Sequence, residues 1–171
     1  LLQGLGFCNS CVADSLLQVL SPTLSFKPGP VGKLPFAEMP SSIITQIVSD
    51  AVRVAEVDWN AYERSWDFQS LPLLTVSSET PPTLESSYTA WVTQNRDIIA
   101  EMKRLEEENN RLFIDAYGLA NELTPDVPIE QITLTINPAY RYSGKMSKEE
   151  LWTRFREDSM QELVSYAIGC M

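Results

Sequence analysis

Hydrophobic positions follow helical spacing over most of the chain. Between residues 84 and 119, apolar side chains recur at alternating steps of four and three, a heptad pattern that continues for about five repeats. This pattern predicts one long, coiled-coil-like helix. Two asparagines, Asn95 and Asn109, fall on the seam itself. A buried amide there penalises a slipped register, because it needs a partner that can hydrogen-bond.

A second long helix is predicted to begin after Ser41 or Ser42 and to end near Phe68, because apolar residues again recur at steps of three and four. The proline-rich connection at residues 69–83 is long enough for the two helices to fold back on each other antiparallel. We therefore expect a helical spacer hairpin. A seam between two copies of the chain is the competing interpretation.

The flanking regions predict shorter elements. Residues 1–20 have the pattern of a single buried helix, and a proline-rich loop follows it. The β-branched, alternating run at residues 129–136 predicts a strand, and Ser147 with Glu150 predicts a capping box that begins a last helix. The expected fold class is mainly α, a long antiparallel hairpin with flanking helices and one short β segment. It divides into residues 1–42 (helix and loop), 43–123 (hairpin) and 124–171 (strand, loop and C-terminal helix).

Composition excludes several classes of protein. The 171 residues are 44% hydrophobic and 21% charged, with no apolar run near the roughly 20 residues that a membrane-spanning helix needs. Histidine is absent, which removes Ser-His and Cys-His nucleophile pairs and zinc sites built on imidazole. Three cysteines do not form a secreted disulfide framework, so we expect a cytoplasmic protein. Because the chain opens without Met and stops inside a helical pattern, we expect a piece of a longer polypeptide.

The net charge of −10 bears on nucleic-acid binding. An acidic domain repels the phosphate backbone, so any contact with DNA is expected to be local. An acidic DNA mimic is another interpretation, which the mixture of charge signs disfavours. Basic and aromatic residues in the predicted loops combine attraction to phosphate with base stacking. The candidates for DNA contact are Lys27, Lys33, Arg141, Tyr142 and Lys145.

Residues 137–140, Asn-Pro-Ala-Tyr, invite comparison with the Asn-Pro-Pro-Tyr signature of amino-group DNA methyltransferases. The second proline is missing and no glycine-rich cofactor turn lies upstream, so the stretch is better interpreted as an Asn-Pro turn after a strand. Cys8 and Cys11 are interpreted as small hydrophobic residues of a core helix. The sequence therefore predicts no catalytic, cofactor-binding or metal-ligating residues.

Trp59, Tyr62 and Trp66 form an aromatic stripe at helical spacing. Such a stripe could stack on bases, but aromatic residues at this spacing more often belong to a hydrophobic core. We expect these three side chains to be buried.

Several stretches resemble the PglX family, the large adenine-specific DNA methyltransferases of bacterial phage-exclusion (BREX) systems. The stretches that carry the resemblance are residues 6–10, 20–26, 32–36, 110–119, 122–125 and 163–171. The resemblance implies a parent protein that transfers a methyl group from S-adenosylmethionine to adenine N6, with its catalytic and cofactor motifs upstream of the matching part.

The resemblance implies that this chain is a non-catalytic segment of a bacterial methyltransferase, and not an enzyme by itself. Residues 1–42 are similar to the edge of a target-recognition region, and the long helices are similar to a spacer. The expected partners are DNA through the parent protein, the catalytic domain of the same chain and other phage-defence subunits, with no membrane. The alternative is a helical protein–protein interaction module with no role on DNA.

Overall fold

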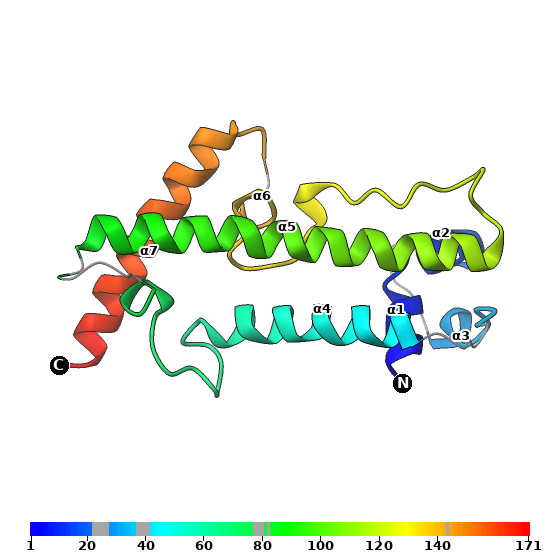
Figure 1. The fold of residues 1–171 in the computed structure, drawn as a ribbon, viewed down its shortest axis with the longest axis horizontal. Coiled ribbons are helices and arrows are strands. Elements are labelled where there is room, and N and C mark those ends of the chain that lie inside the picture. The colour runs from blue at the N-terminus through cyan, green and yellow to red at the C-terminus, as the bar shows by residue number, and fades with distance from the viewer. Residues whose placement is uncertain (22–27, 37–41, 77–80, 82, 143) are drawn as a thin grey trace. The chain divides into compact units, whose positions relative to one another are not determined.

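The computed structural model describes residues 1–21, 28–36, 42–76, 81, 83–142 and 144–171. All regular secondary structure in these residues is helical, which confirms the mainly α prediction (Figure 1). No described helix combines the length and the apolar character needed to cross a membrane. The α-helices are α1 (Leu2–Cys8), α2 (Cys11–Leu20), α3 (Pro28–Val31), α4 (Ser42–Asn60), α5 (Leu84–Tyr117), α6 (Pro138–Arg141) and α7 (Lys148–Gly169), with 3₁₀ turns η1 (Pro72–Leu74) and η2 (Ile129–Gln131).

The chain divides into two compact units, and each takes its residues from separate parts of the sequence. Unit 1 comprises Leu1–Arg53 and Met102–Val127, and unit 2 comprises Val54–Glu101 and Pro128–Met171. Helices α4 and α5 therefore each contribute residues to both units. The predicted segments 1–42, 43–123 and 124–171 describe divisions along the chain and stay a prediction.

Unit 1 is built around a core that four helices share. Phe7 of α1 contacts the rings of Phe113 and Tyr117 of α5, with ring centroids 5.6 and 5.7 Å apart. Its ring also lies 5.5 Å from Phe36, so this loop residue is anchored to the same cluster. Burial of this aromatic and aliphatic surface is the main source of stability for the unit. The core residues are Phe7, Val12, Ala13, Ile44, Val48, Phe113 and Ile114.

The single helix predicted for residues 1–20 is wrong in one respect, because the structure breaks it into α1 and α2. Ser10 lies at the break with extended backbone angles and caps α2, its hydroxyl accepting a hydrogen bond from the Ala13 amide. The same hydroxyl donates to the Phe7 carbonyl at 2.7 Å. Serine favours this capping role over a helix interior. The break frees the Cys11 amide to donate to the Asn110 side chain at 2.9 Å.

In unit 1, α1 lies between α4 and α5. Gly6 makes this possible, because a Cβ built on it would lie 2.7 Å from Val48 Cγ2 of α4 and 2.8 Å from Asn109 Oδ1 of α5. The Gly6 carbonyl accepts a hydrogen bond from Asn109 Nδ2 at 2.9 Å. The two long helices are thus joined here through α1, whereas the predicted hairpin has them in direct contact.

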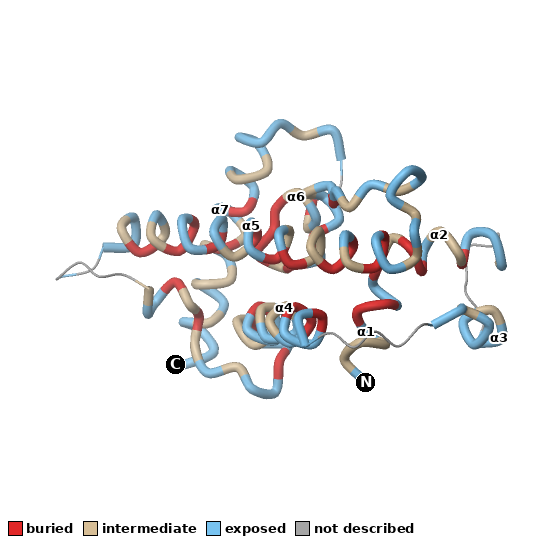
Figure 2. The backbone as a smooth tube through the Cα atoms, turned by 45° about the vertical axis from the view of Figure 1, so that its right-hand side comes forward, coloured by how far each residue is buried: buried red, intermediate tan, exposed pale blue. Residues whose placement is uncertain are grey.

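The central positions of the predicted heptad seam on α5 are mostly buried within the chain, and Figure 2 shows buried positions recurring along this helix. Asn95 is 2% exposed and Asn109 is 7% exposed, as their seam positions predict. In unit 2 the seam packs on α7, where the rings of Trp91 and Phe155 lie 5.2 Å apart. The partner of this part of the seam is therefore α7, which sequence spacing did not indicate.

The strand predicted at residues 129–136 is wrong: the segment holds a 3₁₀ turn and irregular extended chain. Its alternation was meaningful, because Ile132, Leu134 and Ile136 are all buried. The described residues contain no β-strand that pairs with it. Turn hydrogen bonds and polar side chains satisfy its backbone groups where a strand would use a ladder.

The capping box predicted for the last helix is confirmed. The Ser147 hydroxyl accepts a hydrogen bond from the Glu150 amide, and the Glu150 carboxylate accepts one from the Ser147 amide at 2.7 Å. Two amides at the start of α7 are thereby satisfied, which fixes where this helix begins.

Gly6→Ala is expected to destabilise the protein by about 1–3 kcal/mol, because the added methyl group overpacks the contact among α1, α4 and α5. Gly4→Ala is the matched control: it lies in the same helix, a Cβ added there would meet nothing within 4 Å, and alanine favours a helix. Urea unfolding followed by circular dichroism measures both. Equal stability of the two variants would contradict this account of α1.

Candidate functional site

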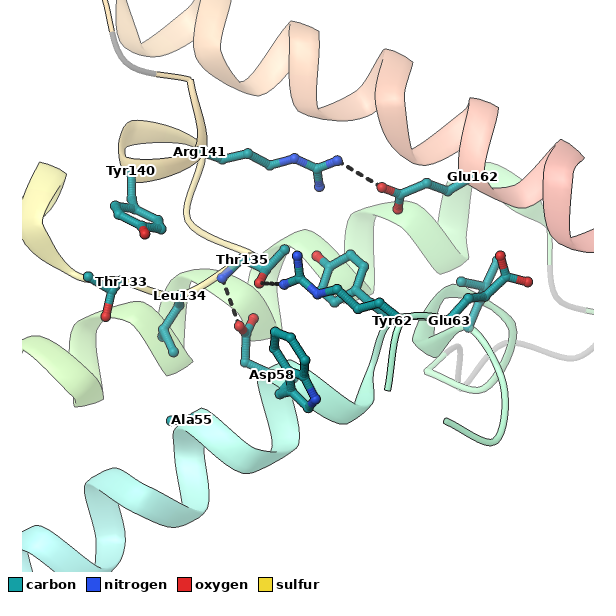
Figure 3. A pocket seen from close by; sticks show the side chains of 13 residues that line it. Ala55, Asp58, Tyr62, Glu63, Thr133, Leu134, Thr135, Tyr140, Arg141 and Glu162 are labelled. Atoms are coloured by element: carbon teal, nitrogen blue, oxygen red, sulfur yellow. Dashed lines mark hydrogen bonds and ion pairs between the residues drawn. The ribbon is translucent and has the colours of Figure 1, made fainter. Parts of the chain in front are cut away.

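Unit 2 contains an open cleft of about 990 Å³ (Figure 3). Its walls come from the C-terminal end of α4 and the loop after it, from the irregular segment before α6, and from α6 and α7. Elements distant in sequence therefore converge on one cavity. The lining residues are Ala55, Asp58, Trp59, Tyr62, Glu63, Arg64, Leu71, Thr133, Leu134, Thr135, Tyr140, Arg141 and Glu162.

Asp58 holds the irregular segment in place. Its buried carboxylate accepts hydrogen bonds from the Thr135 amide at 2.7 Å and from the Ile136 amide at 3.0 Å. Hydrogen bonds to a charged acceptor are among the stronger ones in proteins. The carboxylate thus replaces the neighbouring strand that this β-like segment lacks.

Arg64 links the loop after α4 to the same segment. It donates from Nη2 to Thr135 Oγ1 at 2.5 Å. Its guanidinium lies 4.5 Å from the centroid of the Trp59 ring and 5.4 Å from that of Tyr62, in cation–π geometry. One face of Trp59 is therefore covered by a cation, and the side chain keeps 50% of its surface exposed.

Arg141 and Tyr142, at the end of α6, are tied to acidic residues of α7. Arg141 Nη2 donates to Glu162 at 2.8 Å and lies 3.7 Å from Asp158. The Tyr142 hydroxyl donates to Asp158 at 2.7 Å. Burial and this hydrogen bond raise the pKa of Tyr142, so the hydroxyl remains protonated at neutral pH.

The candidates for DNA contact are distributed unequally. Lys33 is exposed after α3 in unit 1, and Lys145 is exposed after α6 in unit 2, whereas Lys27 lies outside the described residues. Arg141 and Tyr142 come together, but Tyr142 is buried and both already bind carboxylates of α7. A role of these residues on DNA stays a prediction.

Two donors at this cleft lack partners. The Tyr62 hydroxyl and Arg141 Nη1 are buried without a hydrogen bond. Burial is the main cause that raises the pKa of Tyr62, and the charge of Asp58 raises it further. The hydroxyl therefore stays protonated and able to donate. An unsatisfied buried donor costs about 1–3 kcal/mol, so a ligand that supplied an acceptor would regain this energy.

Asn137 is a structural residue. Its side-chain amide donates to the carbonyls of Ile129 and Ile132, at 2.7 and 2.8 Å. Its Oδ1 accepts from the Ala139 amide, and Pro138 occupies the first turn of α6. The side chain is buried and its hydrogen-bonding groups are engaged, so it is not placed to accept a base amine. The interpretation of residues 137–140 as an Asn-Pro turn is confirmed, although no strand precedes it.

Cys8 and Cys11 do not lie where the sequence predicted. Cys8 is exposed at the end of α1, and Cys11 is the first residue of α2, so the two do not lie inside one core helix. Burial raises the pKa of the Cys11 thiol, which disfavours the reactive thiolate. Within the described parts of the chain, no group of three or more Asp, Glu, His or Cys side chains is placed to hold a metal ion.

The aromatic stripe on and after α4 was predicted to be core, and this is wrong for two of its three members. Tyr62 is buried, Trp59 is half exposed and Trp66 is fully exposed. Helix α4 ends at Asn60, so the last two members lie on a loop where helical spacing no longer applies. Sequence reasoning also missed Asp58 as a cleft residue, although an acidic residue at an apolar spacing of the helix was an available signal.

No family model matches this chain. Two curated proteins are similar to it. The adenine-specific methyltransferase PglX of Lacticaseibacillus casei (strain Zhang) is 39% identical over 124 residues, which is 71% of this chain and 10% of that protein. The adenine-specific methyltransferase BrxX of Escherichia coli O9:H4 (strain HS) is 27% identical over 162 residues, or 95% of this chain and 13% of that protein. The chain spans about a tenth of the length of these relatives.

S-adenosylmethionine is the cofactor that the family of these two relatives implies for a whole methyltransferase. The residues of the cleft do not fit it. Of the three carboxylates in the lining, Asp58 already accepts two backbone amides and Glu162 is paired with Arg141, so Glu63 alone is left for both the hydroxyl and the ammonium groups of the cofactor. The glycines with positive φ, Gly118 and Gly144, lie outside the cleft lining.

Asp58→Asn is expected to destabilise the protein by about 2 kcal/mol, because an amide keeps one acceptor and turns an NH₂ group toward a backbone amide. Glu56→Gln is the control, since Glu56 is exposed on the same helix, and it is expected to change stability by less than about 0.5 kcal/mol. Hydrogen exchange at the Thr135 and Ile136 amides should accelerate only in Asp58→Asn. Unchanged exchange would show that the carboxylate does not hold this segment.

Proposed function

The chain belongs to the family of the adenine-specific methyltransferases PglX and BrxX and matches a short segment of them, and we propose that it is a non-catalytic helical spacer associated with target recognition. The parent would be an S-adenosylmethionine-dependent adenine-specific (N6) DNA methyltransferase of bacterial phage defence. The single observation that carries this proposal is homology over most of the chain to a small part of two large methyltransferases.

Helix α5 supports the spacer role. It runs unbroken for 34 residues, which corresponds to about 50 Å of helix. Its first half supplies Trp91 and Val92 to the core of unit 2, and its second half supplies Phe113 and Ile114 to that of unit 1. A continuous helix transmits position better than a flexible linker, so it suits a segment that holds recognition loops in register with a distant catalytic domain.

Contacts with DNA are proposed to be few and local. The net charge of −10 opposes broad binding to phosphates. Lys33 and Lys145 are exposed and free to approach DNA, and Lys27 is kept as a candidate from the sequence. Arg141 and Tyr142 would first have to release the carboxylates of α7. The catalytic domain of the same chain is the proposed main partner, with other phage-defence subunits after it.

A protein–protein interaction module is the second candidate. The seam on α5 does not favour it, because its central residues are buried within the chain. Exposed apolar side chains favour the interaction module. They are Trp66 in the loop after α4, and Val164 and Ile168 near the end of α7. Such side chains are typical of sites that bind another protein surface where they form a contiguous patch.

Ala100→Pro tests the spacer in a full-length methyltransferase that carries this segment. Ala100 is exposed in the interior of α5, and proline there costs about 3 kcal/mol and breaks the helix. We expect adenine methylation to fall at least tenfold while binding of S-adenosylmethionine persists. Ala100→Gly costs about 1 kcal/mol, so its methylation activity should lie between that of Ala100→Pro and that of the wild type.

Leu84→Pro is the control for that experiment, because Leu84 is exposed at the first position of α5, where the amide has no partner within the helix. It should leave methylation nearly unchanged. Equal methylation by the Ala100→Pro and Leu84→Pro proteins would refute the spacer role.

Sedimentation distinguishes the two candidate functions. We expect the chain to remain a monomer over a hundredfold range of concentration, since its seam is satisfied internally. A concentration-dependent dimer that disappears in Val164→Ser/Ile168→Ser would favour the interaction module. Both substitutions are on exposed positions of α7, so the core of unit 2 is left intact.

A further inference from the structure

The cleft of unit 2 has the chemistry of a binding site. The Tyr62 side chain is 9% exposed and its hydroxyl has no partner, and Arg141 Nη1 is a second buried donor without one. Figure 3 shows both side chains reaching into the same space, with Glu162 on the far side of Arg141. Two unsatisfied donors at one cavity call for a ligand that carries a hydrogen-bond acceptor.

The surrounding charge selects a neutral acceptor. Three carboxylates line the cleft, those of Asp58, Glu63 and Glu162, against the two cations of Arg64 and Arg141. The residues of unit 2 as a whole comprise fourteen Asp and Glu against seven Lys and Arg. The charge of Arg141 is already balanced by Glu162. A phosphate or carboxylate would therefore be repelled, whereas an uncharged ring nitrogen or carbonyl oxygen would not.

The rim of the cleft selects a flat ligand. Trp59 and Tyr140 both line it, and their side chains remain 50% and 46% exposed. Aromatic faces of this kind bind planar rings by stacking, and every nucleobase has such a face. Glu63, which is exposed at the same rim, offers an acceptor for an exocyclic amine.

We propose that this cleft binds an unpaired nucleobase, which stacks on the aromatic rim and accepts hydrogen bonds from Tyr62 and Arg141. The inference rests on the proposed function only in taking DNA as the source of the base. It assigns the base, and not the phosphate, as the group that this cleft recognises.

Nucleoside titration of the full chain tests the proposal. Adenosine, guanosine, cytidine and thymidine carry a base without phosphate, and tryptophan fluorescence or NMR shifts report binding at millimolar concentrations. We expect at least one nucleoside to bind with an affinity that is unchanged between 50 and 300 mM salt, because no phosphate contact is made. Inorganic phosphate should not bind.

Tyr62→Phe removes only the unpartnered hydroxyl, so it should weaken nucleoside binding about fivefold without lowering the unfolding temperature. Tyr88→Phe, which removes a tyrosine hydroxyl outside the cleft lining, is the matched control and should bind as the wild type does. Trp59→Ala should weaken binding about tenfold through the loss of stacking.

Three results would overturn the proposal: no nucleoside binds, Tyr62→Phe binds as tightly as Tyr88→Phe, or N-methylacetamide competes as well as a nucleoside. The last would identify a peptide carbonyl as the natural acceptor and a protein as the partner. These outcomes are independent of the Ala100→Pro experiment. If no nucleoside binds, the nucleobase site is refuted and the spacer role is unaffected. If Ala100→Pro leaves methylation unchanged, the spacer role is refuted and the nucleobase site is unaffected.

Discussion

Burial of one face of α5 is the constraint on which both units depend. The apolar residues of this helix form a stripe along one face, and that face must be covered along its length. Different helices cover it in the two units: α1 with α4 beyond it in unit 1, and α7 in unit 2. Each unit thus has its own core while sharing one continuous element.

Buried amides make this covering specific. The Asn109 side-chain amide donates a hydrogen bond, so it needs a partner that brings a carbonyl close to it. The Gly6 carbonyl meets that need, at a position where any side chain on α1 would collide with Val48. Asn110 does the same for α2 by binding the Cys11 amide, and its own amide donates to the Pro125 carbonyl. Polar side chains on α5 therefore set the register of the neighbouring segments, and the apolar ones supply the energy.

The cleft of unit 2 depends on side chains that replace a sheet. A β-like run without a second strand would leave amides unsatisfied, and Asp58 and Asn137 supply acceptors and donors in place of a ladder. The segment is thereby held open on one side, and Thr133 and Thr135 are presented to the cavity. At the same cleft the Tyr62 hydroxyl and Arg141 Nη1 are buried without hydrogen-bond partners, and the proposed nucleobase site rests on these two donors.

Local signals in the sequence were reliable where neighbouring residues decide the outcome. The Ser147–Glu150 capping box and the Asn-Pro turn at residue 137 depend on contacts within a few positions, and the heptad seam is a regular spacing along one helix. The run at residues 129–136 was misjudged because alternation reports which side chains are buried, and a strand also needs a partner for its backbone. The aromatic stripe was misjudged because its spacing has meaning only while the helix continues.

The sequence by itself determined that this chain is helical, where its longest helix lies, which face of that helix is buried and which larger proteins it resembles. Only the tertiary structure decided what covers that face, where the helix at residues 1–20 breaks and which side chains meet in the cleft. Periodicity records burial along one element, but it carries no information about the element on the other side. Asp58 and Thr135 are the clearest example of that difference, because they lie far apart in the sequence and yet form a hydrogen bond.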